Sequence, residues 1–198
     1  PPIENFDPGP RCLHHGWQEQ PNNDLLTFGA YLPNGRIMDG EDGRLKTMVR
    51  ETLATYDGVE LMTTPNQDIL FTNIPPEAKD TFEAHLRSYG WGQRNGNEYS
   101  TLRKASGACV ALPTCALAYT DSERFEPLLL DELEARGYGD LSESIGITGC
   151  ERQCFRPATK TIGWVGQGPD LYAIRLGGSE DARFQGVPLT DGEQWYLR

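Results

Sequence analysis

The sequence predicts an α+β protein made of two units. Two observations support this prediction. Apolar runs of strand length alternate with segments of helical spacing, and a polar stretch over residues 91–107 separates one set of elements from another. No solenoid repeat and no low-complexity tract is visible in the sequence. We therefore expect a first unit over residues 1–92 and a second unit, α/β in character, over residues 93–198.

The first unit should contain a strand, a helix, two strands and a second helix, in that order. Residues 1–20 are rich in Pro, Asn and Asp and are expected to form an arm. The strands are predicted at residues 26–32, 59–62 and 69–74, and the helices at about 43–56 and 75–90. Asn34-Gly35 is a strong two-residue hairpin signal, because both positions tolerate a positive φ. The succession indicates a ferredoxin-like half-domain whose last strand is not obvious.

The second unit is expected to combine a long helix with three strands. Residues 117–136 follow a helical pattern that ends at Gly137, and Pro127 either kinks this helix or begins a new one. Its core candidates are Leu128, Leu129, Leu130 and Leu133. The strands are predicted at residues 144–148, 161–165 and 171–176.

Composition and charge exclude several classes of protein. The chain has 198 residues, of which 37% are hydrophobic and 24% charged, and its net charge is −11. This balance argues against binding to nucleic acid, which relies on Lys and Arg to neutralise phosphates. No apolar run approaches the ~20 residues of a membrane helix and no signal peptide is visible, so we expect a cytoplasmic protein without a membrane partner. The sequence begins at Pro1 rather than Met, which suggests a piece of a longer protein.

Four of the five cysteines form two closely spaced pairs, Cys109-x5-Cys115 and Cys150-x3-Cys154. The first pair is expected in a loop just before a helix, and the second in a loop just after a strand. Four thiolates from loops at element ends can converge on one point, as a cubane iron–sulfur cluster requires. The small residues at 105–108 should let backbone N–H groups approach the inorganic sulfides. A helix N-terminus after Cys115 would favour an anionic cluster.

Three other interpretations of these cysteines remain open. They could be buried apolar side chains, although two tight pairs make this less favoured. They could hold structural zinc in a non-enzymatic interaction module; the C-x3-C spacing suits zinc, but C-x5-C does not. They could form disulfides in an exported protein, which the odd number of cysteines and the missing signal disfavour. Cys12 has no partner at motif spacing and is interpreted as structural or adventitious.

A longer set of motifs surrounds the cysteines. The block Ala108-Cys109-Val110-Ala111-Leu112-Pro113-Thr114-Cys115, followed by Thr148-Gly149-Cys150 and then Cys154, resembles the cluster-binding part of sirohaem-dependent sulfite and nitrite reductases. Further matches, in the expected order, are Gly16-Trp17-x-x-Gln20, Asn34 to Ile37, Thr64 to Gln67, Glu123-Arg124-Phe125, Gly163 to Gly166 and Tyr172 to Gly178. The similarity spans roughly residues 12–180. It corresponds to the C-terminal part of the haemoprotein, and the second unit is expected to be truncated at its C-terminus.

The resemblance implies a 4Fe–4S cluster bound by Cys109, Cys115, Cys150 and Cys154, with the Cys154 thiolate also ligating the iron of a sirohaem. It implies six-electron reduction of sulfite to sulfide or, alternatively, of nitrite to ammonia, with electrons from a ferredoxin or a flavoprotein. Sulfite is favoured because the cluster loops match it more closely. The catalytic residues are expected in an N-terminal half of the enzyme that precedes residue 1, and the isolated chain is expected to be inactive.

Five cations are candidates for binding the carboxylates of the sirohaem: Arg103, Lys104, Arg152, Arg156 and Lys160. Of these, Arg103, Lys104 and Arg156 are preferred. A chain with a net charge of −11 is poorly suited to neutralise those carboxylates unaided, so further cations are expected from the N-terminal half. This chain departs from the family at residues 151–153, where it has Glu-Arg-Gln and the family often has Asn-Gly. These residues lie next to the ligands and affect the hydrogen bonds to sulfur that tune the reduction potential of the cluster.

The remaining polar motifs have sufficient structural explanations. His14 and His15 lie in the expected arm without a spaced carboxylate, and His85 follows Phe82 by three positions on a predicted helix. Residues 64–67 (Thr-Pro-Asn-Gln) could lie near the haem, but a turn between two strands explains them equally well.

Overall fold

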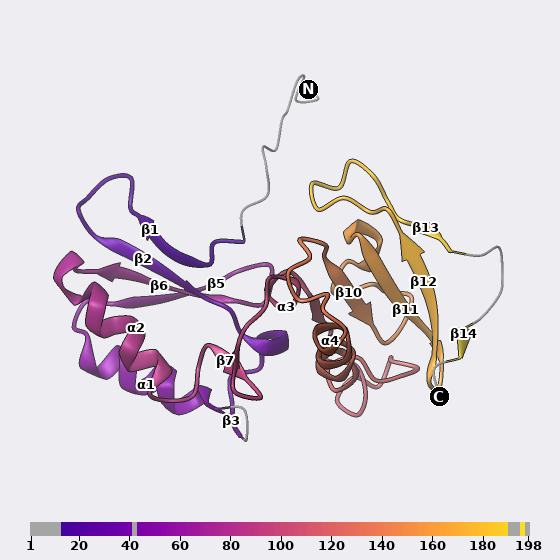
Figure 1. The fold of residues 1–198 in the computed structure, drawn as a ribbon, viewed down its shortest axis with the longest axis horizontal. Coiled ribbons are helices and arrows are strands. Elements are labelled where there is room, and N and C mark those ends of the chain that lie inside the picture. Colours follow the sequence, from indigo (N-terminus) through magenta and orange to yellow (C-terminus); the bar gives the residue numbers. More distant parts are fainter. Residues whose placement is uncertain (1–12, 41–42, 190–194, 197–198) are drawn as a thin grey trace. The chain divides into compact units, whose positions relative to one another are not determined.

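The computed structural model describes residues 13–40, 43–189 and 195–196, so Cys12 lies outside the described part. The chain divides into two compact units, one over Leu13–Tyr99 and one that begins at Ser100 (Figure 1). The boundary therefore falls at Tyr99 rather than after residue 92. In the described part of the chain, no helix is long and apolar enough to cross a bilayer.

The first unit is an antiparallel sheet with two helices on one face (Figure 1). The strand order is β1-β2-β6-β5. Its main elements are β1 (Gly16–Glu19), β2 (Leu26–Ala30), α1 (Leu45–Thr55), β5 (Glu60–Thr63), β6 (Ile69–Ile74) and α2 (Lys79–Arg87). The predicted succession of strand, helix, two strands and helix is confirmed by β2, α1, β5, β6 and α2. Each helix buries an apolar side that includes Met48 in α1 and Phe82 in α2.

The fourth strand of this sheet comes from the segment that the sequence predicts to be an arm. A β-α-β-β-α-β unit takes its last strand after its second helix. Here β1 precedes β2 and pairs with it from Gly16↔Gly29 to Glu19↔Leu26. The arm prediction is therefore wrong for residues 16–19. Trp17 anchors the short strand, since its ring packs 4.8 Å from Phe28 and 5.9 Å from Phe82, measured between centroids.

No hairpin forms at Asn34-Gly35, contrary to the prediction. Both residues do adopt positive φ angles, 50° and 66°, but within the 3-10 turn η1 (Pro33–Gly35). The strand before this turn, β2, already pairs with β1 on one side and with β6 on the other, so neither of its edges is free for a new strand. The chain instead passes through the short ladder of β3 (Asp39–Gly40) and β4 (Gly43–Arg44) and enters α1.

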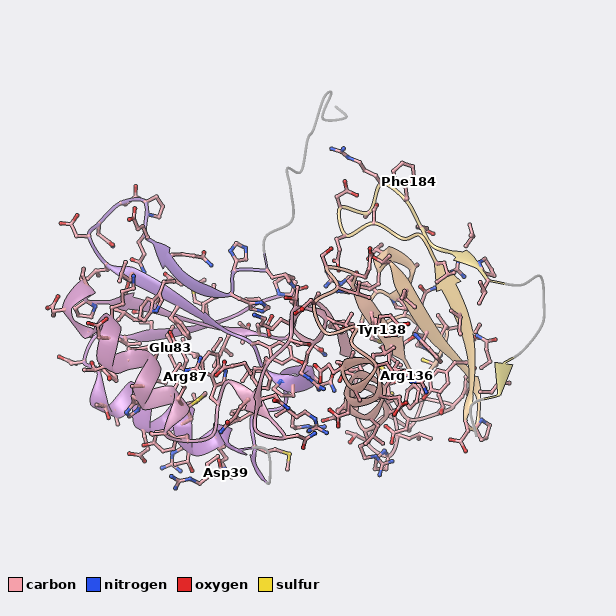
Figure 2. The ribbon with its side chains drawn as sticks, in the orientation of Figure 1. Asp39, Glu83, Arg87, Arg136, Tyr138 and Phe184 are labelled. Atoms are coloured by element: carbon pink, nitrogen blue, oxygen red, sulfur yellow. The ribbon has the colours of Figure 1, made fainter. Side chains whose placement is uncertain are left out.

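The polar stretch at 91–107 is structured rather than a simple connector. It contains the hairpin of β7 (Gln93–Arg94) and β8 (Asn97–Glu98), helix α3 (Thr101–Ala105) and the start of β9 (Gly107–Ala108). Arg87 of α2 holds the hairpin to the helix, because its Nη1 donates to Glu98 Oε1 at 2.6 Å. Its Nη2 also donates to Glu83 Oε1 on the same helix, at 3.0 Å; Figure 2 labels both Arg87 and Glu83. Elements of two residues carry too little periodicity to be recognised in a sequence.

The second unit contains a mixed sheet of order β13-β12-β11-β10-β9, with β14 also paired to β12. The remaining elements are α4 (Phe125–Ala135), β10 (Ile145–Thr148), β11 (Ile162–Gly168), β12 (Leu171–Leu176), β13 (Val187–Pro188) and β14 (Trp195–Tyr196). Strands β9, β10 and β11 run parallel, whereas β12 returns antiparallel to β11. The three predicted strands are confirmed by β10, β11 and β12. The buried core consists of Leu102, Ala108, Leu130, Ile145, Ile147 and Tyr172.

Helix α4 is much shorter than the helix predicted over 117–136. Its first residue is Phe125, so Pro127 lies in the first turn, where no intrahelical N–H is needed. The residues before it form turns because their backbone N–H groups donate to another loop rather than within a helix. Tyr119 N and Thr120 N both donate to Gly149 O, at 2.8 and 3.3 Å. The expectation of a helix N-terminus directly after Cys115 is therefore wrong.

Candidate metal centre

The first cysteine of each pair leaves the carboxyl end of a strand, and the two strands are parallel neighbours. β9 pairs with β10 so that Ala108 lies opposite Ile147. Cys109 follows directly, and its N–H donates to Ile147 O at 3.0 Å, while Cys150 follows β10 by two residues. Ligands of open α/β sheets bind at the carboxyl ends of the strands. The fold therefore brings Cys109 and Cys150 to the same edge of the sheet.

Gly149 joins the two cysteine loops. Its N–H donates to Cys109 Sγ at 3.4 Å, and its carbonyl oxygen accepts the two N–H groups of Tyr119 and Thr120. A Cβ at this position would lie 2.6 Å from Ala111 Cβ and 2.7 Å from Thr120 O, distances that real Cβ atoms do not adopt. The residue before Cys150 must therefore be glycine for the loops to approach this closely.

The loop from Cys109 to Cys115 turns tightly around Ala111. Cys115 N donates to Ala111 O at 2.7 Å, and Ala118 N donates to Cys115 O at 3.2 Å. Ala111 is fully buried and adopts a φ of 42°, in the left-handed region that non-glycine residues rarely occupy. Backbone strain of this kind is concentrated at functional sites and persists where the surroundings enforce it. Here the enforcing contacts include those with Gly149.

Cys154 is positioned by the segment that follows it. Phe155, Pro157 and Lys160 lie over three glycines that share one register across the parallel strands: Gly107 in β9, Gly146 in β10 and Gly163 in β11. A Cβ at these glycines would approach Phe155 Cζ to 2.4 Å, Lys160 Cγ to 2.6 Å and Pro157 O to 2.2 Å, respectively. The segment, which includes the 3-10 turn η3 (Pro157–Thr159), therefore lies directly on the strand backbones.

The four thiols are free and share one region of the second unit. Cys150 is buried, Cys109 and Cys115 are half-buried, and Cys154 is exposed. The pKa of Cys154 is raised, first by partial desolvation and then by the negative charge of Cys109, Cys150 and Cys115, which all act on it. Within the described ranges, no group of three or more His, Cys, Asp or Glu side chains is arranged to hold a metal ion. The thiols of a cubane each bind a different iron and are expected within about 7 Å of one another.

Two of the five candidate cations are committed to buried ion pairs. Arg103 is 2% exposed, and its Nη2 donates to Asp131 Oδ1 at 2.6 Å and to Glu134 Oε2 at 2.7 Å. Lys160 is 1% exposed, and its Nζ donates to Glu180 Oε1 at 2.7 Å and to Ala105 O at 3.2 Å. The expectation that Arg103 binds a cofactor carboxylate is thus not supported by its contacts.

The other three cations are more accessible. Arg152 is exposed, and Lys104 and Arg156 are half-buried. Burial lowers the pKa of Arg156, whose guanidinium lies 6.0 Å from the centroid of the Phe155 ring. Arg152 and Arg156 flank Cys154 in the sequence, so they are better placed than Arg103 to meet a group bound at that thiol.

The histidines and the turn at 64–67 belong to the first unit. His15 has a carboxylate partner that no sequence spacing indicated: its Nε2 lies 2.9 Å from Asp68 Oδ2, and Asp68 is 2% exposed. His85 is half-buried with its ring near Tyr56 and Tyr89, and burial lowers its pKa. Thr64 Oγ1 accepts the N–H groups of Asn66 and Asp68, which gives the turn a structural explanation.

Tyr172 was not among the predicted site residues, although it helps to position the first cysteine loop. Its hydroxyl donates to Asp121 O and lies 3.3 Å from Thr120 Oγ1, and its ring stacks on Phe125 at a centroid distance of 5.1 Å. Burial is the main reason that its pKa rises to about 12, so the hydroxyl keeps its proton. The hydrogen bond to Asp121 O and the stacking on Phe125 fix the backbone between Cys115 and α4. Its place at the start of the matched motif Tyr172 to Gly178 is a sequence signal at this residue, but the motif does not indicate this role.

Comparisons with known proteins identify relatives for most of the chain. No protein-family model matches the sequence. The sulfite reductase [NADPH] hemoprotein beta-component of Staphylococcus haemolyticus is 37% identical over 167 residues, which are 82% of this chain. The protein of that name from Methylobacterium nodulans is 40% identical over 173 residues, or 84% of this chain. In both cases the chain spans only 28% of the relative's length.

A solved structure supports the same relationship. The fold matches that of the Mycobacterium tuberculosis NirA protein with a TM-score of 0.72 and 26% sequence identity, over 91% of this chain and 34% of that protein. The fold is mixed α+β, as the sequence predicts. By sequence and by structure, the chain is therefore homologous to one section of the sulfite reductase haemoproteins.

Proposed function

We propose that this chain is the section of a sirohaem sulfite reductase that binds a 4Fe–4S cluster through Cys109, Cys115, Cys150 and Cys154. The observation that supports this most strongly is the pair of cysteine loops at the carboxyl ends of the parallel strands β9 and β10, joined through Gly149. Four free thiols, with a backbone N–H directed at one sulfur, match the type and number of ligands that an iron–sulfur cluster requires, although the side chains of the described residues are not closed around a metal position.

The exposure of Cys154 suits a second role for this residue. Three of the thiols are partly or fully buried, whereas Cys154 is exposed and could also ligate the iron of a sirohaem. Arg156 and Lys104, with Arg152 beside Cys154, are the proposed partners of the sirohaem carboxylates. When bound, the two groups would supply electrons and a site for substrate reduction. The residues of this chain hold the thiolates in place, donate hydrogen bonds to sulfur and offer cations to the carboxylates.

The substrate and the electron donor are proposed from the relatives. Their name specifies sulfite and NADPH, so we favour six-electron reduction of sulfite to sulfide in the complete enzyme, with electrons that come from NADPH through another component, such as a flavoprotein. An anionic substrate needs cations that bind it and deliver protons. Since Arg103 and Lys160 are engaged in ion pairs, we place those catalytic cations in the remainder of the enzyme.

Cluster assembly tests the proposal directly. The chain is incubated anaerobically with ferrous iron and sulfide, and protein-bound iron, acid-labile sulfide and the EPR spectrum of the reduced form are measured. The unmodified chain and the Cys12→Ser control should bind four irons and four sulfides, whereas Ser at Cys109, Cys115, Cys150 or Cys154 should prevent assembly. Zinc without iron or sulfide in the purified chain, or a complete cluster in Cys150→Ser, would contradict the assignment.

A further inference from the structure

Ser122 is buried directly beside the first cysteine loop. Its side chain is 0% exposed, and its carbonyl oxygen accepts the N–H of Glu126 at 2.9 Å, which fixes the residue at the entrance to α4. Its Oγ lies 3.9 Å from Cys109 Sγ. The residue belongs to none of the motifs recognised in the sequence, and it is not one of the proposed ligands.

Cys109 Sγ therefore has two potential hydrogen-bond donors. The first is the N–H of Gly149, at 3.4 Å, and the second is the hydroxyl of Ser122. In the free thiol, the S–H group is itself a weak donor and can point at Ser122 Oγ. A metal-bound thiolate has no proton, so in that state the Ser122 hydroxyl must act as the donor. Hydrogen bonds to an ionised acceptor are shorter and stronger than those between neutral groups, so the contact should tighten when the thiolate forms.

We propose that Ser122 is a positioning residue that raises the reduction potential of the cluster by donating a hydrogen bond to the Cys109 thiolate; this inference rests on the proposed function. Reduction adds negative charge to the cluster and to its cysteine sulfurs. A donor aimed at one of those sulfurs therefore stabilises the reduced form more than the oxidised form. Because Ser122 is completely buried and Cys109 is half-buried, solvent screens this interaction less than it would at the protein surface.

The neighbouring Thr120 provides a matched control. Its side chain is also buried, 2% exposed, and lies two residues away in the same segment. Its hydroxyl, however, lies 3.3 Å from the hydroxyl of Tyr172 rather than next to a cysteine sulfur. Thr120→Val removes a buried hydroxyl of similar surroundings and keeps the volume of the side chain. Ser122→Ala removes the hydroxyl next to Cys109, and Ser122→Thr retains it.

The experiment compares the chain and these three variants after anaerobic reconstitution with ferrous iron and sulfide. Iron and sulfide content is measured first, and the midpoint potential is then obtained by redox titration followed by EPR. All four proteins should carry the same amount of cluster. In Ser122→Ala the equilibrium should shift toward the oxidised cluster by roughly three- to tenfold. A shift of this size corresponds to a fraction of the free energy of a hydrogen bond to a charged group. A tenfold shift corresponds to about 59 mV for a one-electron couple.

The possible outcomes separate this inference from the proposed function. Ser122→Thr should keep the potential of the unmodified chain. In Thr120→Val, the equilibrium between oxidised and reduced cluster should change by less than about twofold, which is less than the shift expected from a hydrogen bond to a charged group. An unchanged potential in Ser122→Ala, or an equal shift in Thr120→Val, would overturn the role of Ser122 while the cluster assignment stands. If Ser122→Ala fails to assemble a cluster, Ser122→Thr decides: a cluster with normal potential supports the inference, and a shifted potential or no cluster refutes it. No cluster in the unmodified chain would refute the proposed function itself.

Discussion

Replacing Gly149 by Ala tests whether the two cysteine loops depend on their close contact. The new Cβ would lie 2.6 Å from Ala111 Cβ, 2.7 Å from Thr120 O and 3.0 Å from Ala118 Cβ. Two of these atoms belong to short side chains and one to the backbone, so none of them can move away by a rotation of its own side chain. Relief requires the loops to separate, which weakens the two hydrogen bonds to Gly149 O and the one to Cys109 Sγ.

The expected magnitude follows from these contacts. Overpacking of a dense site costs about 1–3 kcal/mol. Each weakened hydrogen bond adds up to about 1 kcal/mol. We therefore expect Gly149→Ala to lower the free energy of unfolding of the second unit by about 2–4 kcal/mol. Chemical denaturation measures the loss, and hydrogen exchange of peptides that cover residues 109–120 shows where protection is lost.

Gly168→Ala is the matched control within the same sheet. A Cβ at Gly168 meets only Leu171, at 3.8–3.9 Å, which is an ordinary van der Waals contact. This variant should stay within about 0.5 kcal/mol of the unmodified chain, as is usual for substitutions without a specific mechanism of damage. If Gly149→Ala were as stable as Gly168→Ala, with unchanged protection over 109–120, the argument that Gly149 joins the loops would be refuted.

Further predictions concern the ion pair, the segment after Cys154 and the isolated chain. Arg103→Met should cost about 2–4 kcal/mol of unfolding free energy by denaturation, because it leaves partly buried carboxylates without their cation, whereas Arg136→Met at an exposed pair should cost less than about 0.5 kcal/mol. If Arg103→Met impaired only sirohaem binding, its structural role would be refuted. Burial opposes the charged form of Glu134, yet hydrogen bonds from Arg103 and Ser100 outweigh it and lower its pKa below 4.5. The stabilisation by Glu134 should therefore be complete above its pKa in the unfolded state, and it should be lost as the pH falls through its lower pKa in the folded state. Denaturation at several pH values should show this dependence, and Glu134→Gln should abolish it. Phe155→Ala should cost about 3–5 kcal/mol through the cavity it leaves, against nearly none for the exposed Phe184→Ala; equal stability of the two variants would contradict the packing described for Phe155. Finally, the isolated chain should bind sirohaem weakly and should not reduce sulfite with reduced viologen as donor; robust turnover would show that the anion-binding cations are misplaced.

The cysteines could be predicted from the sequence, but the way they are brought together could not. Their paired spacing is visible without any structure. Strand β9, which positions Cys109, has only two residues, Gly107 and Ala108, and gives no periodic signal. The residues after Cys115 have apolar side chains at helical spacing, yet their N–H groups bond to Gly149 in the other loop. A tertiary hydrogen bond of this kind overrides local propensity, and local propensity is all that a single sequence displays.

The sequence also could not predict which of the candidate cations are buried in ion pairs, and the reason is different. Arg103 and Lys104 are adjacent in the sequence and are equally polar by composition. Arg103 points to the carboxylates of α4 and is 2% exposed, whereas Lys104 is half-buried on the same short helix. The difference depends on which side of α3 packs against α4. A helix of five residues has too few apolar positions to specify that side.

The three aligned glycines help to anchor the loop from Cys150 to Cys154, which is held by neighbouring structure both before its first residue and after its last. A glycine within a strand usually weakens it, yet Gly107, Gly146 and Gly163 each lie in one of the three parallel strands. Their lack of a side chain lets Phe155, Pro157 and Lys160 lie directly on the sheet, which anchors the chain just after Cys154, while β10 anchors it just before Cys150. Only residues 151–153 and the two cysteines themselves lie between these anchors, and the N–H of Gln153 donates back to Cys150 O at 3.4 Å. Since ordering a residue costs about 1–2 kcal/mol, a loop anchored at both ends retains more of the binding free energy than a loop anchored at one end.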